Sequence, residues 1–545
     1  MFTKLLAAAA KKKFILFRWF DISLNTTKKG FLFFSRIMIR RLLLTAVLML
    51  GALPATYFIF QNLNGGFLPD EDKGVLMCEV ELPPGAALPR TNNAMLEFSE
   101  KVQKIKGVRE VIAVSGFSIM SGASENLGFA IVTLDDWSKR TTPDLSISAI
   151  RGKIMEMGAT IPQGEVRAFQ PPAIMGLGVT GGVTFAFRTA GGETPQEFEQ
   201  QMGKLLGMLN NKQLMPEVAF AFSGFNARTP QVFLDIDREK AEALGIPTDR
   251  IMTFMQSSFA SLYVNDFNIK GYSFKVKIQL DGDERSTLSA LEETMVQNNN
   301  GDMVPLSAFT TPKIMLGARK IERFDQNMSA AITVIPVPGA SSAEIMDKIE
   351  AMVKKDFPNH YTVGWTDMSY QEKNNDGRIL ILMTLAVIFG YLFLVAQYES
   401  WTVPLPVILS VTFAMLGGVA ALWMTDMLLD IYAQLGLIML IGLCAKSTIL
   451  MVEFSMQERA SGKSVVRAAL NGANYRYRAV LMTAWSFIFG VLPLLFASGA
   501  GAESRRVIGT TTFWGMLAAT ILGVAFIPPL YTLFQKAREK VKNKH

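Results

Sequence analysis

Six long apolar segments constrain the fold of this chain more than any other feature of its sequence. They cover residues 42–61, 379–398, 403–425, 431–452, 479–500 and 507–535. Each is long enough for an α-helix to cross the hydrocarbon core of a bilayer, which takes about 20 residues. Lys446 is the one charged residue within them. The sequence therefore predicts an integral membrane protein with six transmembrane helices.

The composition argues against several classes of protein. Hydrophobic residues make up 50% of the 545 and charged residues 19%, and there are two His and two Cys. A His/Cys metal enzyme, a zinc module and a disulfide-stapled domain are therefore not expected. Gln457 occupies the position where a phosphate-binding loop ending at Ser464 needs glycine. His360 and His545 leave no plausible Ser/His/Asp triad. We expect no ATP-driven motor, no cofactor and no metal.

Basic residues predict the orientation of the chain in the membrane. Residues 1–41 contain ten Lys/Arg and one acid, residues 453–478 form a loop with five Lys/Arg, and residues 536–545 form a basic tail. Because such segments stay in the cytoplasm, we expect both termini there and residues 62–377 on the extracytoplasmic side.

The N-terminal segment has a pattern of its own. Residues 1–37 interleave Phe, Ile, Leu and Trp19 with Lys and Arg. This pattern favours an amphipathic helix on the cytoplasmic membrane surface, and the alternative is an irregular basic tail. An apolar piece precedes the first basic cluster, the reverse of the order in a signal peptide, so we expect no cleavage.

The large segment between the first and second spans predicts a folded α/β domain. Residues 75–86 and 330–341 both read as a strand and a Pro-Gly-Ala turn before a helix, and residues 182–209 form a third copy. In that copy Thr194 and Glu197 form a capping box. Strand candidates follow each helix, so the units are β-α-β and suit ferredoxin-like sandwiches. Residues 231–312 break the pattern and predict an inserted subdomain.

Lys446 is the strongest candidate for a functional residue. A cation within a span costs about 2.5 to 3.5 kcal/mol and normally has a partner or a task. The alternative is that Lys446 reaches the cytoplasmic surface, about 10 Å away at Glu453. Thr483 could meet Lys446 from the next span, or its hydroxyl could bond back to its own helix. No carboxylate lies in the interior of a span, so a proton-binding partner should come from another polypeptide.

Six motifs resemble the second half of resistance-nodulation-division multidrug efflux pumps of the AcrB type. They are GFLPDEDKG (66–74), YVNDF (263–267), MSYQE (368–372), YESW (398–401), GLCAKSTILMVEF (442–454) and RAVLMTAW (478–485). The resemblance implies six spans, two periplasmic porter subdomains and a docking subdomain. It also implies a location in the inner membrane of a bacterium, with residues 62–377 in the periplasm. In the family the pump is a trimer that works with a periplasmic adaptor and an outer-membrane channel.

The resemblance assigns a proton relay to three residues. In the family, two aspartates of the first half exchange protons opposite a lysine, a threonine and an arginine of the second half. These three match Lys446, Thr483 and Arg476, and no position here matches the aspartates. Protons would be the coupling ion, and the aspartates would have to come from an N-terminal half on a separate chain.

The resemblance also implies a substrate-binding region at residues 116–128 and at Phe169. The first is expected to be a flexible loop in which Gly116 allows the chain to reshape and the apolar Phe117, Ile119 and Met120 contact ligands. The alternative is a hairpin whose apolar residues only cover a core. Ile112, Ile119 and Ile131 stand where well-known members have Phe, and Gly176 replaces an acid, so drug preference does not transfer. We count Gly116, Phe117, Ile119, Phe169, Ile112 and Ile131 as candidate substrate-binding residues.

Together these observations predict the C-terminal half of a secondary transporter, not an enzyme. It would export hydrophobic or amphiphilic compounds in exchange for protons. The alternative is a truncated pump fragment without transport activity, or a membrane-tethered periplasmic binding or assembly module. Lys446 separates the two, because a tether has no use for a cation within the membrane.

Overall fold

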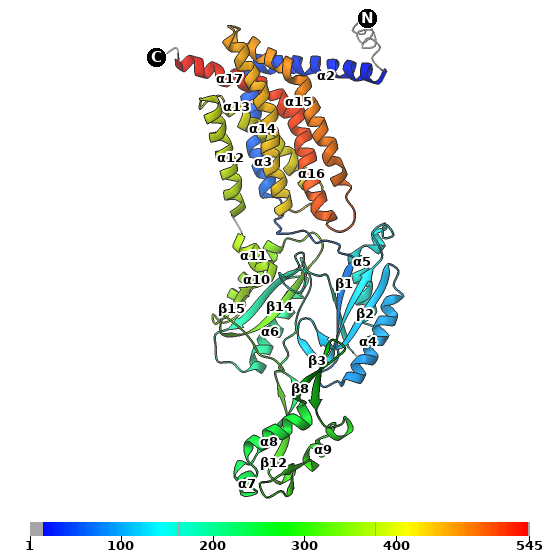
Figure 1. The fold of residues 1–545 in the computed structure, drawn as a ribbon. Helices are drawn as coiled ribbons and strands as arrows, with labels where there is room; N and C mark the ends of the chain where they lie inside the picture. The colour runs from blue at the N-terminus through cyan, green and yellow to red at the C-terminus, as the bar shows by residue number, and fades with distance from the viewer. Residues whose placement is uncertain (1–14, 162–163, 376–377, 543–545) are drawn as a thin grey trace. The chain divides into compact units, whose positions relative to one another are not determined.

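The computed structural model describes residues 15–161, 164–375 and 378–542 of the chain (Figure 1). These residues form two compact units. The first unit contains the long apolar helices and two β-sheets. The second consists of Glu193–Gln200 and Phe225–Ile321 and interrupts the first in the sequence.

Six helical segments among the described residues are long and apolar enough to cross a membrane, as predicted. The first four are α3 (Leu42–Gln61), α12 (Arg378–Tyr398), α13 (Leu405–Met424) and α14 (Ile431–Ala460). The fifth is α15 (Val465–Leu495). The sixth joins α16 (Ala502–Ala518), the π-helical η5 (Ala519–Gly523) and α17 (Val524–Lys542). Buried side chains from α13, α14, α15 and α16 form a shared core.

Several of the predicted boundaries differ from the structure. The expected loop at 453–478 is wrong, because α14 continues to Ala460 and α15 already starts at Val465. Hydrophobicity detects only the apolar part of a helix, and here both helices continue into polar sequence. Gly462 ends α14 in a left-handed conformation that suits glycine (φ 88°). Helix α15 ends at Leu495, five residues before the predicted end, and α16 begins five residues before the predicted sixth span.

The helix predicted near the N-terminus is present as α2 (Ile15–Arg40), and residues 1–14 of that prediction lie outside the described residues. Helix α2 packs on α15 and α17. Phe31 stacks on Tyr477 with ring centroids 4.7 Å apart. The α2 helix is therefore fixed to the ends of the apolar helices by direct packing.

The first β-sheet has the strand order β2-β3-β1-β4 and is antiparallel throughout. Its strands are β1 (Val75–Glu81), β2 (Val108–Ser118), β3 (Gly122–Leu134) and β4 (Glu165–Phe169). Helices α4 (Leu88–Gln103) and α5 (Ile147–Gly158) lie between strands in the sequence and share a buried core with one face of the sheet. Helices α4 and α5 therefore cover the same face of the first sheet. Among the described residues from β1 to β4, no helix covers the opposite face.

The second sheet has the order β13-β14-β5-β15, with β6 paired to β14. Its strands are β5 (Val183–Thr189), β6 (Val218–Ser223), β13 (Glu322–Phe324), β14 (Asn327–Pro336) and β15 (Tyr361–Trp365). Helix α6 (Pro195–Leu209) lies between β5 and β6 in the sequence, and α10 (Ser342–Asp356) between β14 and β15. The predicted capping box is present, since Thr194 N donates to Glu197 Oε2 at 2.8 Å and Glu197 N donates to Thr194 Oγ1 at 3.3 Å.

The second unit extends beyond the predicted 231–312. It includes the strands β7 (Thr229–Ile236), β8 (Leu262–Ile269), β9 (Tyr272–Ile278) and β12 (Thr310–Gly317). Its helix α8 (Thr248–Met255) is followed by a π-helical turn. Buried residues around Ile251 and Phe309 give this unit a small core of its own.

Candidate functional site

Lys446 lies on α14, and its side chain is exposed at the surface of this chain. Among the described residues it makes no hydrogen bond and no ion pair. It is also within the apolar part of α14 that is suited to cross a membrane. Within the described residues, the apolar part of α14 therefore carries a cation without a partner, at a place where a charge normally has one.

Thr483, which was expected to meet Lys446, and Thr448 on α14 both make other bonds. Thr483 Oγ1 on α15 donates to two carbonyls of its own helix, at 3.1 and 2.9 Å, which is the alternative that the sequence left open. Thr448 is buried, and its hydroxyl shares a 2.9 Å hydrogen bond with Ser410 of α13. Neither hydroxyl satisfies the ammonium of Lys446.

Arg476 on α15 packs against an aromatic ring of α14. Its guanidinium carbon lies 3.7 Å from the ring centroid of Phe454 on α14, a cation–π contact. Its Nε is buried and has no hydrogen-bond partner among the described residues. Thr483 follows Arg476 by seven residues, so the two lie on the same face of α15 about 10 Å apart along the helix. Lys446, Arg476 and Thr483 thus lie on two packed helices without direct bonds to one another.

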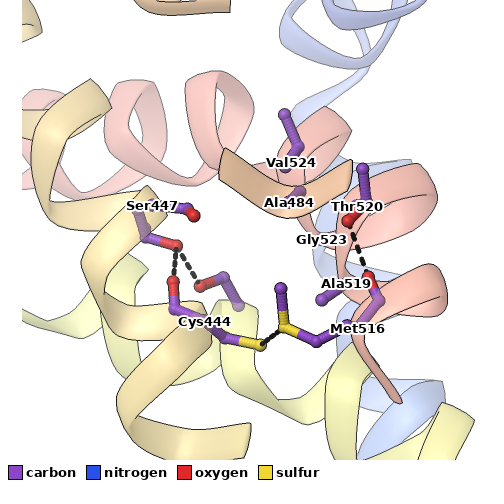
Figure 2. A pocket seen from close by; sticks show the side chains of 10 residues that line it. Cys444, Ser447, Ala484, Met516, Ala519, Thr520, Gly523 and Val524 are labelled. Carbon is purple, nitrogen blue, oxygen red and sulfur yellow. Dashed lines mark hydrogen bonds between the residues drawn. The ribbon is translucent and has the colours of Figure 1, made fainter. Parts of the chain in front are cut away.

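A small cavity lies on the inner side of α14, as Figure 2 shows. It has a volume of about 20 Å³, which is room for about one water molecule. Cys444 donates to the sulfur of Met516 at 3.8 Å, and Thr520 Oγ1 donates to the Met516 carbonyl at 2.6 Å (Figure 2). The π-helical η5 contributes three of the lining residues, Ala519, Thr520 and Gly523. Lys446 does not line this cavity.

The face of the first sheet that no helix covers brings together residues from all four strands. Strand pairing places Ile112, Ile131, Met77 and Phe169 in one row from β2 to β4. The next row is Val114, Phe129, Glu79 and Arg167. Side chains alternate between the two faces of a strand, so these rows lie opposite the core formed with α4 and α5. Three of the predicted substrate-binding residues therefore share one row.

The predicted flexible loop at 116–128 is wrong, because this segment forms a β-hairpin. Strand β2 runs to Ser118 and β3 starts at Gly122, with Phe117 paired to Ala123. Gly116 has a φ of 83° at an irregularity in the pairing, which is a conformation that favours glycine. The hairpin was the alternative that the sequence left open, and strong strand pairing explains why it is favoured.

Apolar residues of this region differ in exposure. Ile112 and Phe117 are 56% and 40% exposed. Ile119 and Ile131 are half-buried, and Phe169 is fully buried, stacked on Phe222 of the second sheet at 6.2 Å. Ile119 and Met120 pack against this aromatic pair. The face therefore has an exposed apolar border on β2 and a buried aromatic end on β4.

Glu79 is a buried carboxylate in the middle of this face. It is 5% exposed, and its Oε1 accepts hydrogen bonds from the Ser118 hydroxyl and, at 3.4 Å, from Met120 N. Burial raises the pKa of Glu79 above its ordinary value, and the hydrogen bonds from Ser118 and Met120 and the charge of Arg167 offset this only in part. Ser118 Oγ also accepts bonds from Met120 N at 3.1 Å and Ser121 N at 2.9 Å. Glu79 thus anchors the hairpin turn.

Arg167 is the nearest cation, and it is engaged by other carboxylates. Its Nη1 lies 2.8 Å from Glu81 and its Nη2 lies 2.9 Å from Glu165. Its guanidinium carbon also lies 5.5 Å from the ring centroid of Phe222. Reasoning from the sequence missed Glu79 and Arg167, although the alternation in VLMCEVE at 75–81 already places Met77, Glu79 and Glu81 on one face.

Six candidate membrane spans and two antiparallel sheets flanked by helices define an integral membrane protein with a large α/β part outside the apolar helices. The unpaired lysine at membrane depth is typical of transporters within this class. The chain belongs to the AcrB/AcrD/AcrF family, whose sequence model matches residues 1–535. The resemblance found in the sequence motifs is thereby confirmed.

Several curated relatives are efflux transporters. Multidrug export protein AcrF of Escherichia coli strain K12 is 34% identical over 503 residues, which is 91% of this chain and 48% of the relative. The multidrug/solvent efflux pump membrane transporter MepB of Pseudomonas putida is 32% identical over 513 residues, which is 94% of this chain and 48% of the relative. Multidrug resistance protein MdtF of Escherichia coli O6:H1 is 31% identical over 88% of this chain and 46% of the relative. The chain spans about half the length of the curated relatives that it matches.

Proposed function

We propose that this chain is the C-terminal half of a proton-driven efflux transporter that exports hydrophobic or amphiphilic compounds in exchange for protons. An N-terminal half on a separate chain completes the pump. The similarity supports this proposal, since it covers 94% of this chain and 48% of MepB. The relatives' names describe multidrug and solvent efflux.

The observation that carries the proposal is the unpaired Lys446. Its exposed position on α14 allows a carboxylate of a neighbouring helix to approach from outside this chain. A carboxylate beside a lysine has its pKa lowered, and its protonation releases the lysine, so a pair of this kind can couple proton binding to movement. Two aspartates of the N-terminal half take this role in the proposed relay, together with Thr483 and Arg476. Drug export from cells that express this chain with and without such a half tests the proposal.

The domain roles follow from the topology. Both sheets belong to β-α-β-β-α-β units, in which the sequence order and strand order support ferredoxin-like porter repeats. The inserted unit around Phe225–Ile321 serves as the docking subdomain. The complete pump works as a trimer in the inner membrane, with a periplasmic adaptor and an outer-membrane channel.

A reporter fusion tests the proposed orientation. An alkaline phosphatase fused after Gly377 is expected to be active, because residues 62–377 lie in the periplasm, whereas the same reporter at His545 is expected to be inactive. A fluorescent protein that folds in the cytoplasm should give the opposite pattern at the two positions. The same location for both fusions would contradict six spans with cytoplasmic termini.

In this proposal, the substrate-binding region is the face of the first sheet that no helix covers. Gly116, Phe117, Ile119, Phe169, Ile112 and Ile131 all lie on this face or on the hairpin that borders it. Exposed Ile112, Val114 and Phe117 offer an apolar surface to ligands. Phe169 is buried against Phe222, so it contacts a ligand only after this aromatic pair separates.

Replacing Phe117 by aspartate tests the role of this face. The Phe117→Asp variant, expressed with the N-terminal half, is expected to lower export of bulky apolar compounds about fivefold, which corresponds to about 1 kcal/mol of lost apolar contact. Its expression should change little, because the side chain is 40% exposed. The readout is drug susceptibility normalised to protein level.

Leu96→Asp is the matched control, since Leu96 is 56% exposed on α4, on the other side of the same sheet. This variant should leave export unchanged. If Phe117→Asp reduces protein level and export in parallel, Phe117 serves the core of the hairpin and not the ligand.

A further inference from the structure

Glu79 is a buried carboxylate without an ion pair among the described residues. Among the described residues its acceptor bonds come from the neutral Ser118 hydroxyl and Met120 amide, and it has no ion-pair partner. Burying an ionised carboxylate is costly unless an opposite charge compensates it. Arg167 is paired across the strands with Glu79, but its guanidinium binds Glu81 and Glu165. Arg167 therefore acts on Glu79 without forming an ion pair with it.

The charges on the two adjacent strands leave this face negative. Glu79, Glu81 and Glu165 contribute three negative charges and Arg167 contributes one positive charge, which gives a net charge of −2. Val166 and Ala168 alternate with these residues and point into the core on the other side of the sheet. This face therefore attracts a positively charged ligand more strongly than a neutral ligand of the same shape.

Apolar surface lies at a suitable distance from the carboxylate. Val114 on β2 is in the same row as Glu79 and two strands away, which is about 10 Å at the usual strand spacing. Val114 is 45% exposed and Ile112 is 56% exposed. A molecule with an apolar body and one cationic group can lie across β2 and β3 while its charge reaches Glu79.

We infer that Glu79 makes the substrate site of this chain selective for cationic amphiphiles, by pairing its carboxylate with the positive charge of the ligand. This inference rests on the proposed function of the sheet face. The ligand cation becomes a further partner of the Glu79 carboxylate, beside the Ser118 hydroxyl and the Met120 amide.

Equilibrium dialysis of the purified chain in detergent against two probes tests the inference. Tetraphenylphosphonium is the cationic probe and triphenylphosphine oxide is the neutral probe, with empty micelles as the blank. Glu79→Gln removes the charge but keeps an oxygen that accepts from Ser118. We expect this variant to bind the cation about tenfold more weakly, which corresponds to about 1.4 kcal/mol, and the neutral probe as the wild type does.

Glu156→Gln is the matched control, because it removes the same charge from an exposed position on α5, on the other side of the same sheet. Its affinity for both probes should equal that of the wild type. An equal loss of both probes in Glu79→Gln would overturn the inference, since Glu79 would then act only by holding the hairpin. Unchanged cation binding in Glu79→Gln would overturn it as well.

A further variant separates failure of the inference from failure of the site. Phe117→Asp should weaken binding of the neutral probe, because it changes the apolar border of the face. Suppose that Phe117→Asp weakens binding of the neutral probe while Glu79→Gln leaves binding of the cationic probe unchanged. The proposed substrate site would then be supported, and the inferred selectivity for cations would be wrong. If the wild-type chain binds neither probe above the micelle blank, the proposed substrate site itself is wrong, and the inference fails with it.

Discussion

Reconstituted alone into liposomes with an imposed proton gradient, the purified chain is expected to show neither drug transport nor drug-dependent proton flux. The apolar helices contain Lys446 but no Asp or Glu in the interior of the predicted spans. The proposal assigns proton binding and release to aspartates of the N-terminal half, and the lone chain does not supply them. The expected rate is therefore that of empty liposomes.

Adding aspartates at membrane depth should restore both drug transport and drug-dependent proton flux. Co-reconstitution with a six-span half that carries two adjacent aspartates at membrane depth is expected to give drug transport and coupled proton flux. The control is the same half with both aspartates replaced by asparagine, which keeps the shape and removes the titratable groups. Proton-coupled transport by the lone chain would contradict the proposal that it is half of a pump.

Lys446→Ala, expressed with the N-terminal half, is expected to abolish drug export while membrane insertion is kept or improved. Removing a cation from the interior of a span lowers the insertion cost by about 2.5 to 3.5 kcal/mol. The same change removes the charge that the aspartates are proposed to face. Export measured as dye efflux from energised cells, with protein quantified in the membrane fraction, separates the two effects.

Lys106→Ala is the matched control for this experiment, because Lys106 is an exposed lysine between α4 and β2. It should retain both export and expression. Undiminished export by Lys446→Ala would leave the alternative that Lys446 only reaches toward the membrane surface. Loss of Lys446→Ala from the membrane fraction would contradict the expected gain in insertion.

The membrane part of the fold was predictable because its signal is strong and local. A run of about 20 apolar residues without charge is rare in soluble domains and is typical of a membrane-spanning helix. The lengths of α14 and α15 were not predictable in this way, since their polar extensions up to Ala460 and from Val465 carry no hydrophobic signal. The π-helical η5 has no recognisable pattern either, because its residues ATILG suit an ordinary α-helix.

The sites were predictable to different degrees. Lys446 stood out because a charge among apolar residues is rare and costly, but its lack of a partner within the described part of the chain depended on the directions of the side chains. The row of Ile112, Ile131, Met77 and Phe169 depends on strand register, which pairs residues more than 90 apart in the sequence. Glu79 was missed because a glutamate in a strand is usually exposed, and only the packing of the hairpin turn buries it.

The inserted unit begins and ends on paired strands. Thr229 at the start of β7 is the pairing partner of Gly317 at the end of β12. Thr229 and Gly317 lie near the two ends of the insert in the sequence. Because they are paired, they are one strand spacing apart, about 5 Å. Such an insert behaves as a cassette, because a short turn could replace it without a large loop-closure cost to the remaining chain. Such a unit can thus be exchanged between relatives while the strands of the second sheet on either side of it stay intact.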